Sequence, residues 1–309
     1  MEALPYRRMD RARPDLRPLA IGEMVDGALR LFRSNFLTLI KISAMVMVPI
    51  AVIQLIATVL VGPVDLQSLT TLDPNADIEQ VLAPFGSIYG VLGITSVLSM
   101  VGSVIVQGAS ITAFTQAYQG QEPEWRTSLR AGIRRFWPLL AATLLITIGS
   151  AVGLIFCIVP GVFLFTVWSV APAALVAEQK GPVAAMSRSG NLVRGRFWPV
   201  LGAIFLAYLL YLVASQIVSA LAGVITILGT LNTGTYSFIP TVVGSSIVSV
   251  LASPFLAAMV TIIYFDLRVR KEGYDLELMA ADLQRMSHEP EALPRSDDHP
   301  FGLDTPGDQ

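Results

Sequence analysis

Six long apolar stretches, separated by shorter polar segments, dominate the pattern of the chain. Each approaches or exceeds the roughly 20 residues that a helix needs to cross a hydrocarbon core about 30 Å thick. Because no water is available at that depth, each stretch must satisfy its own backbone hydrogen bonds, and this predicts α-helices. The predicted membrane spans cover residues 36–62, 88–118, 136–159, 161–177, 197–226 and 241–265.

A recurring phrase introduces the first, third and fifth of these spans. It reads RSNFLTLI at 33–40, IRRFWPLL at 133–140 and RGRFWPVL at 194–201. Arginine suits the depth of the lipid phosphates, Phe and Trp suit the membrane interface, and proline is tolerated in the first turn of a helix. The phrase therefore predicts the three points at which the chain passes from the surface into the membrane.

A short segment with apolar residues at helical spacing precedes each of these points. Arginines occupy the other sides of the segments, which predicts three amphipathic helices lying on the cytoplasmic leaflet. The predicted fold is an all-α, polytopic membrane protein with six transmembrane helices, arranged as three helical hairpins that each follow a short interfacial helix. The apolar positions are Ile21, Met24, Val25, Ala28 and Phe32; Trp125, Leu129, Ile133 and Phe136; and Val183, Met186 and Val193.

Composition and charge add a direction to this architecture. Hydrophobic residues make up 53% of the chain and charged residues only 14%, with a mean hydropathy of +0.63, as expected of a membrane protein. All 21 Lys and Arg residues fall before the first span or in its opening turns, between spans two and three, between spans four and five, or after span six. By the positive-inside rule, both termini are expected in the cytoplasm.

Four regions follow from these patterns. Residues 1–20 form a basic cytoplasmic N-terminal segment, and residues 21–270 form the six-span membrane domain. Residues 271–287 carry apolar side chains at helical spacing and are predicted to form an amphipathic cytoplasmic helix. Residues 288–309 are rich in Pro and Asp and poor in apolar residues, which predicts a disordered acidic tail.

Three stretches resemble a known family. They are IGEMVDGALRLFRSNF at 21–36, the run that begins VPGVFLFTVW at 159 and ends RGRFWPVLG at 202, and YFDLRVRKEGYDLELM at 264–279. They are similar to the membrane-domain family named after bacterial glycerophosphoryl diester phosphodiesterases. The resemblance implies six spans in a bacterial inner membrane. It does not imply phosphodiesterase activity, because the catalytic α/β barrel of about 250 residues has no counterpart in this chain.

Candidate chemistry is sparse along the chain. Cys157 stands alone, and His288 and His299 both lie in the tail, so no metal ion, cofactor or disulfide is expected. The interiors of the spans hold no Asp, Glu or His that could act as an acid, base or nucleophile. Glu178 and Asp266 lie at span ends beside basic residues, which predicts local charge pairing. We therefore expect no enzymatic activity and no nucleic acid partner.

The basic positions suggest the function that the sequence favours. Clustered Arg and Lys beside a membrane attract anionic lipid, so we expect a non-catalytic scaffold or accessory protein that contacts anionic headgroups, a partner protein or a second copy of itself. The candidate contact residues are Arg134, Arg135, Arg194, Arg196 and Arg268.

A transporter or permease for a small solute or lipid is the alternative. The most polar groups well inside the spans are Gln54, Gln107 and Gln216, and they could meet in a solute pathway. A glutamine that bridges two packed helices would have the same sequence pattern. Proton coupling is not expected, because no carboxylate lies inside a span.

Overall fold

The computed structural model describes residues 20–61, 78–119, 121–233 and 239–273, and all regular structure in these ranges is helical. The predicted basic segment, the acidic tail and nearly all of the helix predicted at 271–287 lie outside the described residues. The helices are α1 (Ile21–Ser34), α2 (Phe36–Val61), α4 (Ile78–Tyr118), α5 (Trp125–Arg134), α6 (Phe136–Phe156), α7 (Ile158–Trp168), α8 (Ala171–Ala177), α9 (Pro182–Val193), α10 (Phe197–Thr233) and α11 (Ile239–Glu272).

Six helical segments are long and apolar enough to cross a membrane, which confirms the predicted all-α fold with six spans. Five of them belong to single helices, and the fourth consists of α7 and α8 together, with a break in front of Pro172. This break is expected because a proline cannot donate the backbone hydrogen bond that would continue the preceding helix. The segments are Phe36–Leu60, Leu92–Tyr118, Phe136–Phe156, Ile158–Ala177, Phe197–Ile225 and Val242–Glu272.

The recurring phrase marks a break between a short helix and the span that follows it. Asn35 alone separates α1 from α2, and Arg135 alone separates α5 from α6. Between α9 and α10 the break is longer, because Gly195 is inserted with φ +86°. A residue with a side chain is strained at such an angle. The third copy of the phrase, RGRF, therefore needs glycine at this position, whereas the second copy, RRF, has no residue there.

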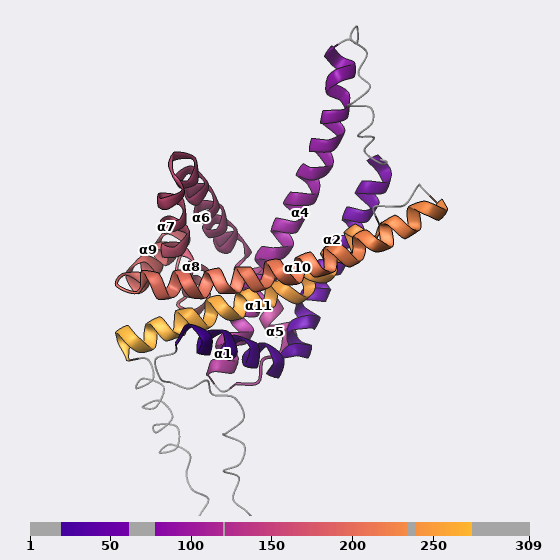
Figure 1. Ribbon diagram of the computed structural model, residues 1–309. Helices are drawn as coiled ribbons and strands as arrows, with labels where there is room; N and C mark the ends of the chain where they lie inside the picture. Colours follow the sequence, from indigo (N-terminus) through magenta and orange to yellow (C-terminus); the bar gives the residue numbers. More distant parts are fainter. Residues whose placement is uncertain (1–19, 62–77, 120, 234–238, 274–309) are drawn as a thin grey trace, which may run out of the picture.

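Consecutive spans pack against one another in three pairs: α2 with α4, α6 with α7, and α10 with α11. Figure 1 shows that α4 and α6–α7 diverge from the end of the molecule that holds α1 and α5. Two helices of a hairpin must make contacts of this kind. That each pair crosses the membrane as a hairpin stays a prediction. Helix α11 also contacts α1, α2 and α4, so it connects the pairs.

The most tightly buried side chains gather at one end of the spans. They come from the first turns of α2 and α6, from the last turns of α4 and α11, and from α8 and α9. Hydrophobic burial gives little drive for association between helices in lipid, whereas it favours packing where the short amphipathic helices meet the spans. The largest fully buried side chains are Tyr264, Phe114, Phe265, Leu39, Ile42, Ile111, Leu139, Leu175, Leu192, Met259, Ile263 and Leu267.

The three short helices are present as predicted, but much of their apolar surface contacts protein instead of lipid. On α1, Met24, Val25 and Ala28 are buried, and the helix packs on α11 and α10. Helix α5 docks on α4 through a small residue: a Cβ at Gly132 would lie 2.7 Å from the backbone nitrogen of Ala109. The predicted apolar positions Ile133 on α5 and Val183 on α9 remain exposed.

Glycines also permit the close approach of α6 and α7. A Cβ on Gly153 would lie 2.9 Å from the Cα of Gly161, and the chain turns between the two helices at the extended residue Cys157. This contact agrees with the small-residue spacing of the sequence, since small side chains let transmembrane helices pack closely. Helix α4 begins ten residues before the predicted span.

Candidate functional site

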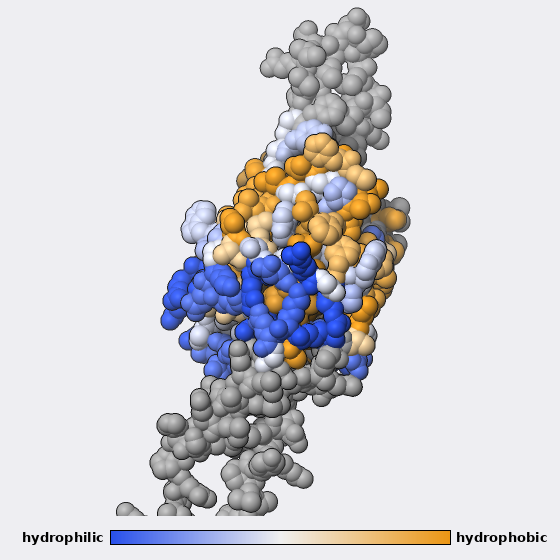
Figure 2. Space-filling view, turned by 90° about the vertical axis from the view of Figure 1, so that its left-hand side faces the viewer, coloured by the Kyte–Doolittle hydropathy of each residue, from blue (hydrophilic) through white to orange (hydrophobic). Residues whose placement is uncertain are grey.

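Polar and charged side chains gather at one end of the described structure, below a hydrophobic body (Figure 2). We call this region the basic end; it comprises α1, α5, the end of α8, α9, the short connections to the spans that follow them, and α11 from Tyr264 onward. The arginines of the recurring phrase lie at the ends of the short helices and in the connections that follow them. The short helices of the basic end pack on the tightly buried core, which limits their movement.

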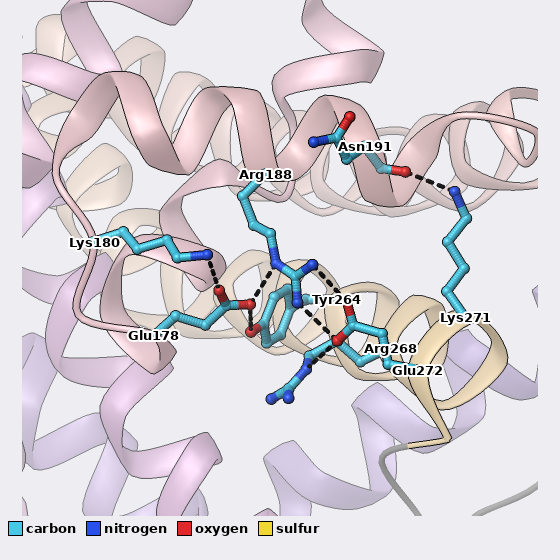
Figure 3. Close-up of polar contacts among 8 residues, drawn as sticks. All are labelled: Glu178, Lys180, Arg188, Asn191, Tyr264, Arg268, Lys271 and Glu272. Carbon is cyan, nitrogen blue, oxygen red and sulfur yellow. Dashed lines mark hydrogen bonds and ion pairs between the residues drawn. The ribbon is translucent and has the colours of Figure 1, made fainter.

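A connected set of ion pairs joins three helices within the basic end (Figure 3). The carboxylate of Glu178, at the end of α8, accepts hydrogen bonds from Arg188 Nε on α9 and from the Tyr264 hydroxyl on α11, both at 2.7 Å. Its second oxygen lies 2.6 Å from Lys180 Nζ. Arg188 then continues to α11, where its Nη1 and Nη2 lie 2.5 and 2.7 Å from the two carboxylate oxygens of Glu272.

The ion pairs keep Glu178 and Arg188 in their charged forms. Partial burial alone would raise the pKa of Glu178, but hydrogen bonds from Lys180, Tyr264 and Arg188 together lower it to about 2. The hydrogen bonds to Glu272 are the main cause of a raised pKa for Arg188. Glu178 is therefore ionised near neutral pH and holds its three donors in place. The pKa of Glu178 is not shifted toward neutral pH, as the pKa of a general acid or base would be.

Lys271 anchors the end of α9 to α11. Its Nζ donates to the backbone carbonyl of Asn191 at 2.6 Å (Figure 3). It also donates to the backbone carbonyl of Arg194 at 2.6 Å. These carbonyls belong to the last turn of α9 and its C-cap, where backbone acceptors lack helical partners. The contact fixes the direction in which the chain leaves α9 and approaches α10.

The structure divides the five predicted contact arginines into two groups. Arg268 pairs with Glu272 at 3.0 Å and lies over the Tyr264 ring, so its guanidinium is engaged within the protein. The side chains of the other four form neither an ion pair nor a hydrogen bond with any described residue. They are Arg134, Arg135, Arg194 and Arg196.

The local pairs expected from the sequence are present. Glu178 contacts Lys180, and Asp266 accepts a hydrogen bond from Arg270 Nε at 2.8 Å. Sequence analysis missed the bonds from Glu178 to Arg188 and Tyr264 because these partners are far apart in the chain. One hint existed, since Glu178 and Tyr264 each lie within a turn of the end of a predicted span.

A cavity of about 270 Å³ lies between α1, α10 and α11. Three of its lining residues are charged: Arg196, from the third copy of the phrase, and the paired Asp266 and Arg270. The rest of its lining is apolar and comes from Ala20, Ile21, Met24, Pro199, Val200, Ile263 and Leu267.

The three glutamines of the transport alternative lie on different helices, and no hydrogen bond joins them within the described residues. Gln54 on α2 donates to the carbonyl of Thr95 at 3.1 Å and to Ser99 Oγ at 2.7 Å, both on α4. This is the interhelical bridge that the sequence left open. Gln107 is partly buried and Gln216 is exposed on α10.

No metal site is found among the residues that the structure describes, since no three His, Cys, Asp or Glu side chains come together there as ligands would. The free thiol of Cys157 is exposed at the turn between α6 and α7. The ion pairs of the basic end can hold its helices together, and its arginines that are unpaired within the described residues can attract anions.

Six apolar helices and a polar end define a multi-pass membrane protein. Residues 86–265, more than half of the chain, match the uncharacterised protein family UPF0259, and the chain belongs to this family. No curated protein and no solved structure matches the chain. The comparisons give no support for the resemblance to the membrane domains named after glycerophosphoryl diester phosphodiesterases.

Proposed function

We propose that this protein is a non-catalytic membrane protein whose basic end binds anionic lipid headgroups. The observation that carries the proposal is the position of the four arginines without ion-pair partners among the described residues, Arg134, Arg135, Arg194 and Arg196. They flank exposed tryptophans at the start of two spans: Trp137 is 75% exposed and Trp198 is 77% exposed. Tryptophan prefers the depth of the headgroups, so these guanidinium groups stand where lipid phosphates lie.

The charge balance at the basic end supports lipid binding. Arg188, Arg268 and Arg270 are neutralised by carboxylates of the protein, so they contribute less to the attraction of an external anion. Arg134, Arg135, Arg194 and Arg196, from the second and third copies of the recurring phrase, keep their charge available. A basic residue close to an anionic membrane surface contributes about 1 kcal/mol of attraction.

The proposal includes a direction and a location. The basic end faces the cytoplasm of a bacterial cell, in agreement with the positive-inside rule, and the protein resides in the inner membrane. No catalytic step is assigned to it, because Glu178, Asp266 and Glu272 are held in ion pairs and the interiors of the spans contain no Asp, Glu or His.

Native mass spectrometry of the gently solubilised protein tests this function. We expect copurified anionic phospholipid, and we expect most of it to be lost when Arg134, Arg135, Arg194 and Arg196 are all replaced by Gln. A matched control replaces Arg30, Arg33, Arg126 and Arg130 by Gln, which removes the same charge from α1 and α5. A stoichiometric protein partner that stays bound without anionic lipid would contradict lipid binding and favour a scaffold role.

A further inference from the structure

The cavity between α1, α10 and α11 has a composition that matches part of a phospholipid. Two guanidinium groups and one carboxylate line it, and its other walls are apolar. Water in the liquid takes about 30 Å³ per molecule, so a cavity of about 270 Å³ has room for a group several times that size.

The charges in the cavity favour a monovalent anion. Asp266 is buried and accepts from Arg270 Nε at 2.8 Å, so these two groups compensate each other. Arg196 makes no ion pair or side-chain hydrogen bond with any residue in the described ranges, and it leaves the cavity with a net charge of one positive unit. A phosphodiester carries one negative charge, whereas a phosphate monoester carries about 1.5 to 2 near neutral pH.

The position of the cavity agrees with the depth of headgroups. Arg196 directly precedes the span that begins at Phe197, and Trp198 beside it is exposed. Val200 and Ile263, which are buried side chains of the packed core, form part of the inner wall. A ligand here would therefore contact the exposed Arg196 and the buried apolar side chains of Val200 and Ile263, as the phosphate and glycerol regions of a lipid require.

Lys271 and Gly195 fix where Arg196 stands. Lys271 holds the last carbonyls of α9, and the positive φ of Gly195 turns the chain so that Arg196 precedes α10. The second copy of the phrase lacks this inserted glycine, and Arg135 alone connects its two helices. The insertion thus distinguishes Arg196 from the arginines that only contribute surface charge.

We propose that this cavity is a specific site for the headgroup of one anionic phospholipid, with Arg196 directed at the phosphodiester and the apolar walls against the glycerol backbone. The inference rests on the proposed function and adds a single saturable site to it. Arg196 is the ligand that can be tested cleanly, because replacing Arg270 would leave the buried Asp266 without its pair.

Lipid retention by the full-length protein in phosphatidylglycerol nanodiscs tests the site. The variant Arg196→Gln is compared with Arg130→Gln on α5, which removes the same charge from the basic end and does not line the cavity. Salt of about 0.5 M screens surface charge strongly, so a lipid held in the cavity should persist while others are stripped. We expect one salt-resistant phosphatidylglycerol per chain in the wild type and in Arg130→Gln, and at least tenfold weaker retention in Arg196→Gln.

Three outcomes would overturn the site. If both variants lose lipid equally, the arginines act only as surface charge, and the general function survives without the cavity. If inorganic phosphate or glycerol phosphate displaces the salt-resistant ligand, the cavity binds a soluble phosphate compound and not a lipid. If the wild type retains no salt-resistant lipid, the site is absent. Thermal unfolding of each variant in detergent without added lipid should match the wild type, which separates loss of a ligand from loss of fold.

Discussion

Arg188 on α9 and Glu272 at the end of α11 form a two-pronged ion pair, with nitrogen–oxygen distances of 2.5 and 2.7 Å. Paired hydrogen bonds between a guanidinium and a carboxylate are stronger and more directional than single ones. The two residues are 84 positions apart, so this contact ties a surface helix to the last span.

Replacing Arg188 by Gln should therefore lower the thermal stability of the protein in detergent. A double-mutant cycle with Glu272→Gln should give a coupling free energy of about 1 kcal/mol, because both side chains are partly exposed and the pair is screened accordingly. Arg268→Gln serves as the control, since Arg268 and Glu272 belong to the same helix and pair at i, i+4. A coupling near zero for Arg188 and Glu272 would mean that the ion pair does not hold α9 in place.

Acid should weaken the packing of α8 and α9 on α11. The pKa of Glu178 is about 2 in the folded protein, below its ordinary value of 4.5. Its stabilising contribution is therefore fully present above about pH 4.5 and is lost as the pH falls toward 2. Thermal unfolding between pH 6 and pH 3 should show this loss in the wild type, and Glu178→Gln should remove that part of the pH dependence. Tyr264→Phe, which keeps the carboxylate, should reduce the effect without abolishing it.

The close contact of α6 and α7 makes Gly161 intolerant of a side chain. A Cβ at this position would lie 2.7 Å from the backbone nitrogen of Leu154, so the two helices would have to separate. Overpacking of this kind costs about 1–3 kcal/mol, and Gly161→Ala should lower the melting temperature. Gly93→Ala in α4 is the matched control, because nothing lies within 4 Å of a Cβ there. Equal melting temperatures for the two variants would contradict the packing of α6 on α7.

The connection between α9 and α10 depends on the conformation of Gly195. Gly195→Ala should destabilise the protein by about 1 kcal/mol, because alanine is strained at a positive φ. Gly195→Asn tests the backbone angle itself: Asn tolerates a positive φ better than Ala, and open space surrounds this position, so Gly195→Asn should lose less stability. If the two variants unfold alike, strain at Gly195 does not shape this connection.

Cys157 reports the orientation of the protein in its membrane. The thiol is exposed at the turn between α6 and α7, away from the helices that carry the recurring phrase. With a cytoplasmic basic end, an impermeant thiol reagent should label Cys157 from the outer side of the inner membrane. Labelling from the cytoplasmic side alone would reverse the orientation, and Cys157→Ser provides the blank.

Local patterns in the sequence were sufficient to predict the helices. Apolar run length gave the six spans, and the recurring phrase gave the starts of three of them, because both features depend on neighbouring residues. Short-range charge pairs such as Asp266 with Arg270 were predictable for the same reason.

Contacts between distant segments could not be predicted in this way. Whether Gln54 bridges helices or faces a pathway depends on which residues of α4 lie opposite it. Arg268 and Arg196 have the same chemistry in the sequence, yet the first is held by Glu272 and the second lines a cavity. Only the packing of α11 against its neighbours distinguishes an arginine that is paired within the protein, such as Arg268, from one that is not paired with any described residue, such as Arg196.

The enrichment of anionic lipid around the reconstituted protein tests the central claim most directly. The protein is placed in nanodiscs of equal parts phosphatidylglycerol and phosphatidylcholine, and the ratio of the two lipids that stay with it after extraction is measured. Binding through Arg134, Arg135, Arg194 and Arg196 predicts a severalfold excess of phosphatidylglycerol that falls to the bulk ratio when all four are Gln. A bulk ratio for the wild type, or an unchanged excess for the variant, would contradict the claim.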